Sequence, residues 1–253
     1  MEILYEDNHL LVVVKPPGIP VQGDISGALD LLSLLKAELK ERYNKPGNVF
    51  LGLVHRLDRP VGGVMVFART SKAASRLSSQ IREHKMDKTY LGVVEGCPGI
   101  LKGRLTDYLL KNKRTNVVRV AEAGTPGSKE AILDYEVLET AKGLSLVKIG
   151  LLTGRSHQIR VQMANNGTPL YGDVKYGHEN HKGRNAEGRV VKDQVAKDQY
   201  AKDHDAKDHD AGEEGGPALW SYQLGIEHPT KKERMLFTSS PPDSYPWNLF
   251  KPV

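Results

Sequence analysis

The sequence has little cysteine and few aromatic residues, and it lacks long hydrophobic runs. Its 253 residues include one cysteine, Cys97, which excludes an internal disulfide and a metal site built from several thiolates. The longest aliphatic run, Leu10 to Val14, falls far short of the ~20 residues that span a bilayer. The first residues lack the basic and apolar regions of an export signal. These absences predict a soluble, cytoplasmic protein with no membrane partner.

Acidic and basic residues are unevenly distributed along the chain. There are 36 Lys and Arg residues against 31 Asp and Glu residues, which gives a net charge of +5. Residues 178–216 contain 7 basic and 10 acidic residues, so the rest of the chain has 29 against 21, or +8. A basic body attracts polyanions and favours nucleic-acid binding, although charge by itself names no reaction.

A low-complexity segment lies inside the acidic stretch. Residues 191–210 read VKDQV AKDQY AKDHD AKDHD and contain almost no large apolar side chains. Such a segment cannot bury enough apolar surface to offset the entropy of ordering it. Its His-Asp pairs could weakly coordinate a divalent metal, but a solvated linker is the favoured interpretation. We therefore predict one domain over residues 1–253 with a disordered insertion at about 178–216.

Hydrophobic periodicity predicts an alternation of strands and helices. Residues that alternate between apolar and polar predict strands, whereas apolar residues spaced three and four apart predict helices. Strands are expected at 3–6, 9–14, 61–68, 89–95, 131–139, 144–151, 219–227 and 234–237. Helices are expected from about 27 to 43, from a cap at Ser71 to about 81, and from about 157 to the Asn166-Gly167 stop. The fold class is therefore α+β, with a mixed and mainly antiparallel sheet.

Two polar segments stand out at the ends of expected strands. In the segment His55-Arg56-Leu57-Asp58, an extended chain would project Arg56 and Asp58 to the same side. A structural ion pair is the plainer interpretation of that segment alone. In the segment from Gly154 to Arg160, a strand leads into a helix whose free N–H groups favour an anion. There His157 and Arg160 would share a helix face, and a merely polar surface is an equal alternative.

Two further segments carry weaker signals. Tyr90 opens a strand and could be an ordinary strand former packed in a sheet. Lys15 begins the turn Lys15-Pro16-Pro17-Gly18, which could be no more than a rigid basic loop between elements. None of the four segments establishes an active site when it is considered alone.

Together, the segments resemble the RluA-type pseudouridine synthases. The resemblance is carried in order by EDNHLLVVVKPPG, VHRLDRPVGGVMVFART, KTYLGVVEG and LLTGRSHQIRVQM, the last followed by GTPLYGDVKYG, and it resumes in LWSYQLGIEHP and LFTSSPP. It covers nearly the whole chain except the insertion. It implies a catalytic domain built on a mixed, mainly antiparallel, bifurcated sheet, with helices and loops that flank a central cleft.

The resemblance also implies a role for individual residues. Asp58 matches the essential catalytic aspartate, Arg56 the arginine that enters the RNA stack as the base leaves, and Tyr90 the tyrosine against the uracil face. Arg160 matches the basic partner of the aspartate. The flanking polar residues that we expect to contact RNA are His55, Arg59, Lys15, Lys88, Arg155 and His157.

The chain departs from the family pattern at three places. Val61-Gly62-Gly63 stands where Thr-Ser-Gly is usual, Gln162 stands where a histidine is usual, and Trp220-Ser221 replaces a common histidine-alanine pair. None of these positions is one of the four to which a catalytic role is carried over. They therefore bear on substrate choice and loop detail more than on activity.

The implied activity is isomerisation of uridine to pseudouridine in structured ribosomal or transfer RNA, after the nucleotide has flipped out of its helix. This reaction needs no cofactor and no metal. We expect a monomer. We also expect no small RNA-binding domain ahead of the catalytic domain, because the first block begins at residue 2. Two alternatives are a non-catalytic RNA-binding module that retains the cleft and a hydrolytic nucleosidase, which would want a second carboxylate or a metal. A carboxylate that faces polyanionic RNA argues against a pure binder.

Overall fold

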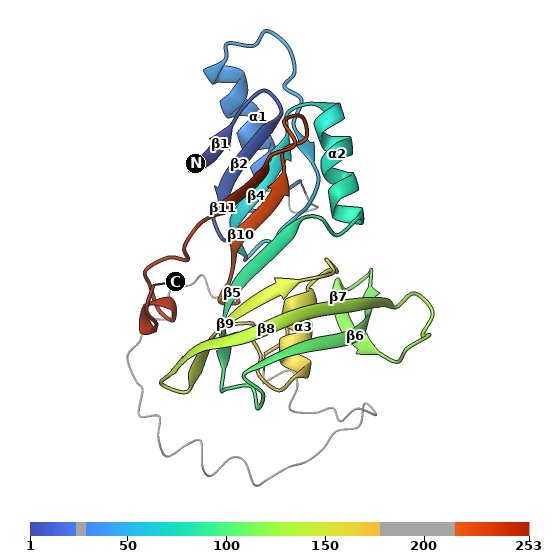
Figure 1. Cartoon of the computed structure of the whole chain (residues 1–253), viewed down its shortest axis with the longest axis vertical. Coiled ribbons are helices and arrows are strands. Elements are labelled where there is room, and N and C mark those ends of the chain that lie inside the picture. The colour runs from blue at the N-terminus through green and yellow to red at the C-terminus, as the bar shows by residue number, and fades with distance from the viewer. Residues whose placement is uncertain (24–28, 178–215, 253) are drawn as a thin grey trace.

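The computed structural model describes residues 1–23, 29–177 and 216–252. Within them, eleven strands form one sheet, and three α-helices pack beside it (Figure 1). The strands are β1 (Ile3–Glu6), β2 (Leu10–Lys15), β3 (Gly52–Leu53), β4 (Gly62–Ala68), β5 (Asp87–Glu95), β6 (Lys102–Asn112), β7 (Val117–Ala121), β8 (Lys129–Ala141), β9 (Leu144–Leu151), β10 (Leu219–Glu227) and β11 (Arg234–Thr238). The helices are α1 (Leu31–Arg42), α2 (Ser71–Arg82) and α3 (Gln158–Asn165), and a 3₁₀ turn spans Trp247–Leu249.

The sheet is mixed and mainly antiparallel. Its strands follow the order β1-β2-β4-β10-β5-β9-β8-β6-β7. The pairing of β4 with β10 is parallel, and the other pairs are antiparallel. In Figure 1, the long strand β5 joins an upper half that contains β1, β2, β4, β10 and β11 to a lower half that contains β9, β8, β6 and β7. Strand β5 therefore lies between the two halves. The loop before β4 and the segment after β9 lie on the same pocket beside it.

The sheet branches where β4 and β10 diverge. The two strands pair only through Gly62 with Trp220 and Gly63 with Ser221. Beyond that point β10 pairs with β11, and the far end of β4 pairs with β3. A Cβ atom at position 62 would overlap the Trp220 ring, and one at position 63 would overlap the Ser221 backbone. The two glycines are therefore what allows these strands to approach so closely.

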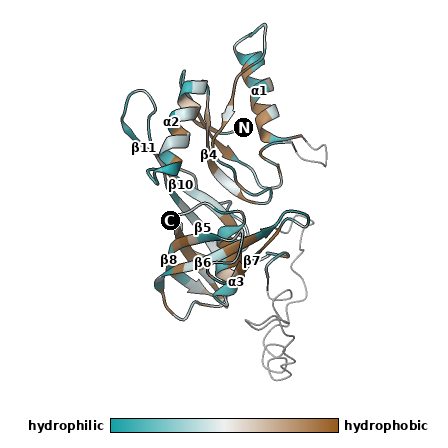
Figure 2. Ribbon diagram, turned by 90° about the vertical axis from the view of Figure 1, so that its right-hand side faces the viewer, coloured by the Kyte–Doolittle hydropathy of each residue, from teal (hydrophilic) through white to brown (hydrophobic). Residues whose placement is uncertain are grey.

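Each long helix buries one apolar face. Helix α1 begins after Asp30, whose carboxylate accepts a hydrogen bond from the Ser33 backbone N–H, and it buries Leu31, Leu35 and Leu39 in the main core. Helix α2 begins after Thr70, which caps the Ala73 N–H in the same way. In Figure 2, hydrophobic colour gathers on α1 and on the strands, while most connecting loops are hydrophilic. Among the described helices, none is long and apolar enough to cross a membrane.

The predicted fold class and the bifurcated sheet are confirmed, with differences in detail. Strands β3, β6 and β7 were not expected. Strand β6 carries many charged residues and owes its form to pairing with β7 and β8, whereas β3 and β7 are short. Thr70, not Ser71, caps α2. Helix α1 begins at Leu31, so the expected start near 27 is not seen, and residues 24–28 lie outside the described part of the chain. Most of the expected insertion, residues 178–215, lies outside it too.

Candidate active site

A pocket of about 580 Å³ opens where the two halves of the sheet meet. Its walls come from the loop before β4, the end of α2, the start of β5, and the segment that joins β9 to α3. Eight of the ten residues singled out in the sequence line it, namely His55, Arg56, Asp58, Lys88, Tyr90, Arg155, His157 and Arg160. Lys15 and Arg59 are not among the residues that line it. The pocket has the size of a small-molecule site and carries one carboxylate, Asp58, among its lining side chains.

Lys15 does not lie where RNA could reach it. Its side chain is fully buried, and its ammonium group donates to three backbone carbonyls, of Pro16 at 2.9 Å, Arg59 at 2.9 Å and Val61 at 2.7 Å. Burial lowers the pKa of Lys15 to about 8, against an opposing effect of the Asp58 charge. The expected contact with RNA is therefore not supported. Lys15 instead holds the backbone on the C-terminal side of Asp58, because its three N–H groups match three converging carbonyls.

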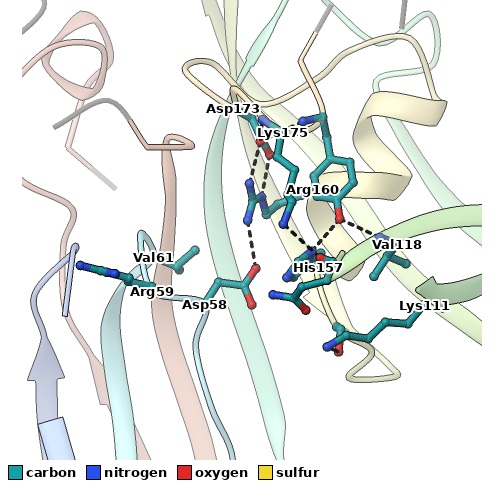
Figure 3. Close-up of polar contacts among 12 residues, drawn as sticks. Asp58, Arg59, Val61, Lys111, Val118, His157, Arg160, Asp173 and Lys175 are labelled. Atoms are coloured by element: carbon teal, nitrogen blue, oxygen red, sulfur yellow. Dashed lines mark hydrogen bonds and ion pairs between the residues drawn. The ribbon is translucent and has the colours of Figure 1, made fainter. Parts of the chain in front are cut away.

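Arg59 also has a local partner. Its Nε donates to the Gly18 carbonyl at 2.9 Å, and the Gly18 N–H donates to the Arg59 carbonyl at 2.9 Å. Figure 3 shows the Arg59 side chain pointing away from Asp58. Arg59 is exposed, but outside the pocket. These reciprocal bonds join the turn after β2 to the loop that carries Asp58.

His55 fills the gap where the sheet branches. The Val66 backbone N–H, which lies on β4 between the pairings with β10 and β3, donates to His55 Nε2 at 3.1 Å. Burial, and after it the charge of Lys88, lowers the pKa of His55 to about 4. The imidazole is therefore neutral at pH 7 and accepts a hydrogen bond from an N–H of β4 that lies between the pairings with β10 and β3. This position gives His55 a role in the fold, although one side of the ring lines the pocket.

The depressed pKa of His55 predicts a pH dependence of stability. The unfolded chain takes up a proton near pH 6.5 and the folded chain only near 4, so the contribution of His55 is complete above pH 6.5 and is lost as the pH falls toward 4. We expect the free energy of unfolding to fall by up to about 1.4 kcal/mol per pH unit from this residue across that window. Urea unfolding at several pH values, with His55→Gln as the comparison, measures it. An equal slope in the two proteins would contradict the prediction.

Arg160 is held between two carboxylates. Its Nε and Nη2 donate to the two oxygens of Asp173, each at 2.7 Å, and its Nη1 lies 3.4 Å from Asp58 Oδ2 (Figure 3). The guanidinium is 7% exposed, the Asp173 side chain 0% and the Asp58 side chain 29%. Although burial opposes its charge, the hydrogen bonds and charges of Asp173 and Asp58 raise the pKa of Arg160. Arg160 is thus fixed by Asp173 and presents its remaining edge to Asp58.

Asp173 was not found from the sequence, and neither was Tyr176 three residues later. Asp173 accepts two further hydrogen bonds from the backbone N–H groups of Lys175 and Tyr176, at 3.0 and 3.1 Å. The Tyr176 ring lies against the Arg160 guanidinium, with 5.1 Å from Cζ to the ring centroid. Both residues lie in the block GTPLYGDVKYG, so the resemblance held the signal, but nothing in their local pattern indicates a role beside Asp58.

Tyr90 and Lys88 stand two residues apart on β5 and therefore face the same side. Tyr90 is 7% exposed, and burial, followed by the charge of Asp58, raises its pKa well above the usual value. It is a neutral phenol in the pocket wall. Burial lowers the pKa of Lys88, whose ammonium lies close to the backbone at Gly154. The pocket thus has a neutral aromatic face and a cation on neighbouring positions of one strand.

The segment from Gly154 to His157 does not lie as expected. His157 precedes α3 and has a left-handed backbone, so it does not share a helix face with Arg160. Arg160 is a buried residue of α3. The side-chain oxygen of Gln158 accepts a hydrogen bond from the Arg155 N–H at 2.9 Å. Arg155 is exposed, and its Nε donates to the Glu130 carbonyl at 2.8 Å. Arg56 is also exposed and lines the same pocket. The wall around Asp58 is therefore basic.

No metal centre is evident in the part of the chain that the structure describes, where no three His, Cys, Asp or Glu side chains converge. The polar chemistry of the pocket instead rests on one half-exposed carboxylate beside a fixed guanidinium. Such a carboxylate is open to a bound molecule, as a nucleophile or a base must be.

The chain thus combines a branched mixed sheet with a carboxylate and a fixed guanidinium at one central pocket. Residues 9–165 match the family model described as RNA pseudouridylate synthase. That match covers more than half of the chain, which therefore belongs to the RNA pseudouridylate synthase family.

Similar curated proteins are named for the ribosome. A ribosomal large subunit pseudouridine synthase D of Zymomonas mobilis is 34% identical over 181 residues, which are 70% of this chain and 56% of that protein. The enzyme of the same name from Pseudomonas aeruginosa is 37% identical over 180 residues, 70% of this chain and 53% of that protein. The chain spans about half the length of the curated relatives that it matches.

Solved structures agree on the fold. Human RNA Pseudouridylate Synthase Domain Containing 4 superposes with a TM-score of 0.71 and 22% identity, over 95% of this chain and 88% of that chain. Human RNA Pseudouridylate Synthase Domain Containing 1 superposes with a TM-score of 0.65 and 23% identity, over the whole of this chain and 88% of that one. At this identity the likeness concerns the fold alone.

Proposed function

We propose that this protein isomerises uridine to pseudouridine in RNA, with Asp58 as the catalytic group. The single observation that carries the proposal is the placement of Asp58, 29% exposed and 3.4 Å from a fixed guanidinium, in a pocket where it is the one lining carboxylate. Family membership supplies the reaction, and the pocket supplies a group able to perform it.

The reaction breaks the bond between N1 and C1′, turns the uracil and joins C5 to C1′, with release of the C5 proton. An ionised carboxylate serves either as a nucleophile at C1′ or as a base that takes the C2′ proton. Arg160 places a positive charge 3.4 Å from Asp58 Oδ2 and so holds this carboxylate in position for either role. The neutral ring of Tyr90 offers a face on which uracil can stack.

The nucleotide must leave the RNA stack to enter the pocket, which costs a few kcal/mol. Arg56 is exposed at the pocket and has the length and planarity to take the place of the departing base. Phosphate contacts come from basic residues that line the pocket, such as Lys88 and Arg155. We therefore expect RNA affinity to fall steeply with salt. We also propose that the protein acts on its RNA in the cytoplasm.

The names of the curated relatives favour ribosomal RNA of the large subunit as the substrate. The other candidate, a non-catalytic RNA-binding module, predicts affinity for RNA without turnover. Mapping of pseudouridines in total RNA from cells with and without the protein distinguishes the two. We expect at least one site to disappear from large-subunit RNA without the protein and to return when purified protein is added to that RNA. Unchanged maps together with RNA binding would favour the non-catalytic module.

A further inference from the structure

His157 has a backbone conformation that a histidine rarely adopts. Its φ is 51° and its ψ is 22°, in the left-handed region, at the residue before α3. That region is unfavourable for a residue other than glycine, because its Cβ crowds the neighbouring backbone. The side chain makes no capping hydrogen bond to α3, so helix capping does not account for a histidine at this position. An outlier that the local structure does not explain points to a functional constraint.

A buried tyrosine fixes the His157 ring. Nδ1 lies 2.6 Å from Tyr176 Oη, and the two rings meet edge to face with centroids 5.6 Å apart. Tyr176 is 5% exposed, and its oxygen accepts a hydrogen bond from the Val118 backbone N–H at 3.0 Å. The same ring lies against Arg160. One tyrosine thus contacts both His157 and Arg160, two of the residues around Asp58.

The proton between these two groups can be placed by their partners. Burial raises the pKa of Tyr176, and burial, only partly offset by Asp58, lowers the pKa of His157, so both side chains are neutral at pH 7. The other charges that bear on His157 come from Arg160, Lys175 and Lys111. We assign the Tyr176 O–H as the donor, because the Tyr176 oxygen accepts from Val118 and Nδ1 lies 2.6 Å away as the acceptor for that O–H. A neutral ring with an unprotonated Nδ1 carries its hydrogen on Nε2.

We propose that His157 is a neutral hydrogen-bond donor that contacts an uncharged oxygen of the nucleoside held at Asp58, and that Tyr176 is its positioning residue. The inference rests on the proposed function and deepens it. The neighbouring lysines and arginines already supply positive charge for phosphates. A neutral N–H on a ring that is fixed at its other nitrogen adds direction, and it fits a uracil carbonyl or a ribose hydroxyl.

The test compares four proteins by kcat/KM for tritium release from [5-³H]uridine-labelled large-subunit rRNA and by RNA affinity between 50 and about 200 mM salt. His157→Asn tolerates the left-handed backbone but cannot reach the Nε2 position, whereas His157→Gln places an amide N–H near it. Tyr176→Phe keeps the ring on Arg160 and loses only the hydroxyl. We expect about a tenfold loss of kcat/KM in His157→Asn and Tyr176→Phe, with partial recovery in His157→Gln.

The thermal transition and the salt dependence separate this role from others. We expect His157→Asn to unfold at a temperature no lower than the unaltered protein, and the salt slope of binding to stay unchanged in every variant. A slope that falls by about one would show that His157 contacts a phosphate and would overturn the proposal. Full activity in His157→Asn would overturn it as well, while leaving the proposed function intact. No tritium release from the unaltered protein would instead count against the proposed function.

Discussion

Asp58→Asn should abolish tritium release from RNA labelled at uracil C5 and leave the fold and RNA affinity nearly unchanged. Removal of a nucleophile or base costs on the order of 10⁴-fold in rate. The fold should survive, because Arg160 keeps both hydrogen bonds to Asp173 when the 3.4 Å contact to position 58 is lost. Affinity should stay within a few-fold, because the substitution removes a negative charge from a surface that meets a polyanion.

The matched control is Asp134→Asn. Asp134 is also an aspartate paired with an arginine, Arg104, but it lies exposed on β8 and outside the pocket. We expect full activity from this variant. Asp58→Ala should behave as Asp58→Asn does, since both lack the ionised carboxylate. Tritium release that persists in both Asp58 variants would remove Asp58 from the mechanism, whatever their affinity for RNA.

Asp173→Ala should cause the largest loss of stability of any substitution proposed for the site. The fully buried Asp173 carboxylate accepts four hydrogen bonds, two from Arg160 and two from backbone N–H groups. Its removal leaves a buried guanidinium with only the longer contact to Asp58, and breaking a buried pair costs about 3–5 kcal/mol. Urea unfolding measures the loss. The protein that remains folded should also lose activity, because Arg160 is no longer held in place.

A double substitution separates charge from packing. Asp173→Asn alone keeps an acceptor oxygen for the backbone N–H groups but leaves Arg160 with Asp58 as its one carboxylate partner, whereas adding Arg160→Met removes the buried positive charge. We expect the double variant to be more stable than Asp173→Asn alone and to remain inactive. A surface comparison, Asp134→Ala, should cost no more than about 1 kcal/mol, since its ion pair with Arg104 is exposed. If the changes in the free energy of unfolding from Asp173→Asn and Arg160→Met simply add, the Asp173 and Arg160 side chains are not coupled.

Much of the fold could be predicted from local pattern. Strands such as β2 and β4 are buried on both faces and read as continuous apolar runs, and α1 repeats leucine at helical spacing. Strands β6 and β7 could not be predicted in this way. Strand β6 is charged and partly exposed, and its partner β8 lies up to 34 residues away along the chain, while β7 is only five residues long and pairs with β6.

The sequence by itself determined the family resemblance, the α+β class and eight of the residues that line the pocket, because motif blocks and hydrophobic periodicity are local properties. Only the tertiary structure decided which side chains meet. Asp58 and Arg160 are 102 residues apart. They come together because the sheet order β4-β10-β5-β9 brings β4, which follows Asp58, near β9, which leads into α3, and two glycines allow β4 to approach β10.

The same reason decides the surroundings of Lys15 and Arg59. Lys15 is buried, with its ammonium bound to three backbone carbonyls. Arg59 donates through Nε to one carbonyl and stays exposed, so its contact with RNA remains a prediction. Asp173 and Tyr176 are unremarkable in sequence and become central once Arg160 is buried against them. A residue type states what a side chain is able to bind, whereas the packing of distant segments determines which partner is within reach.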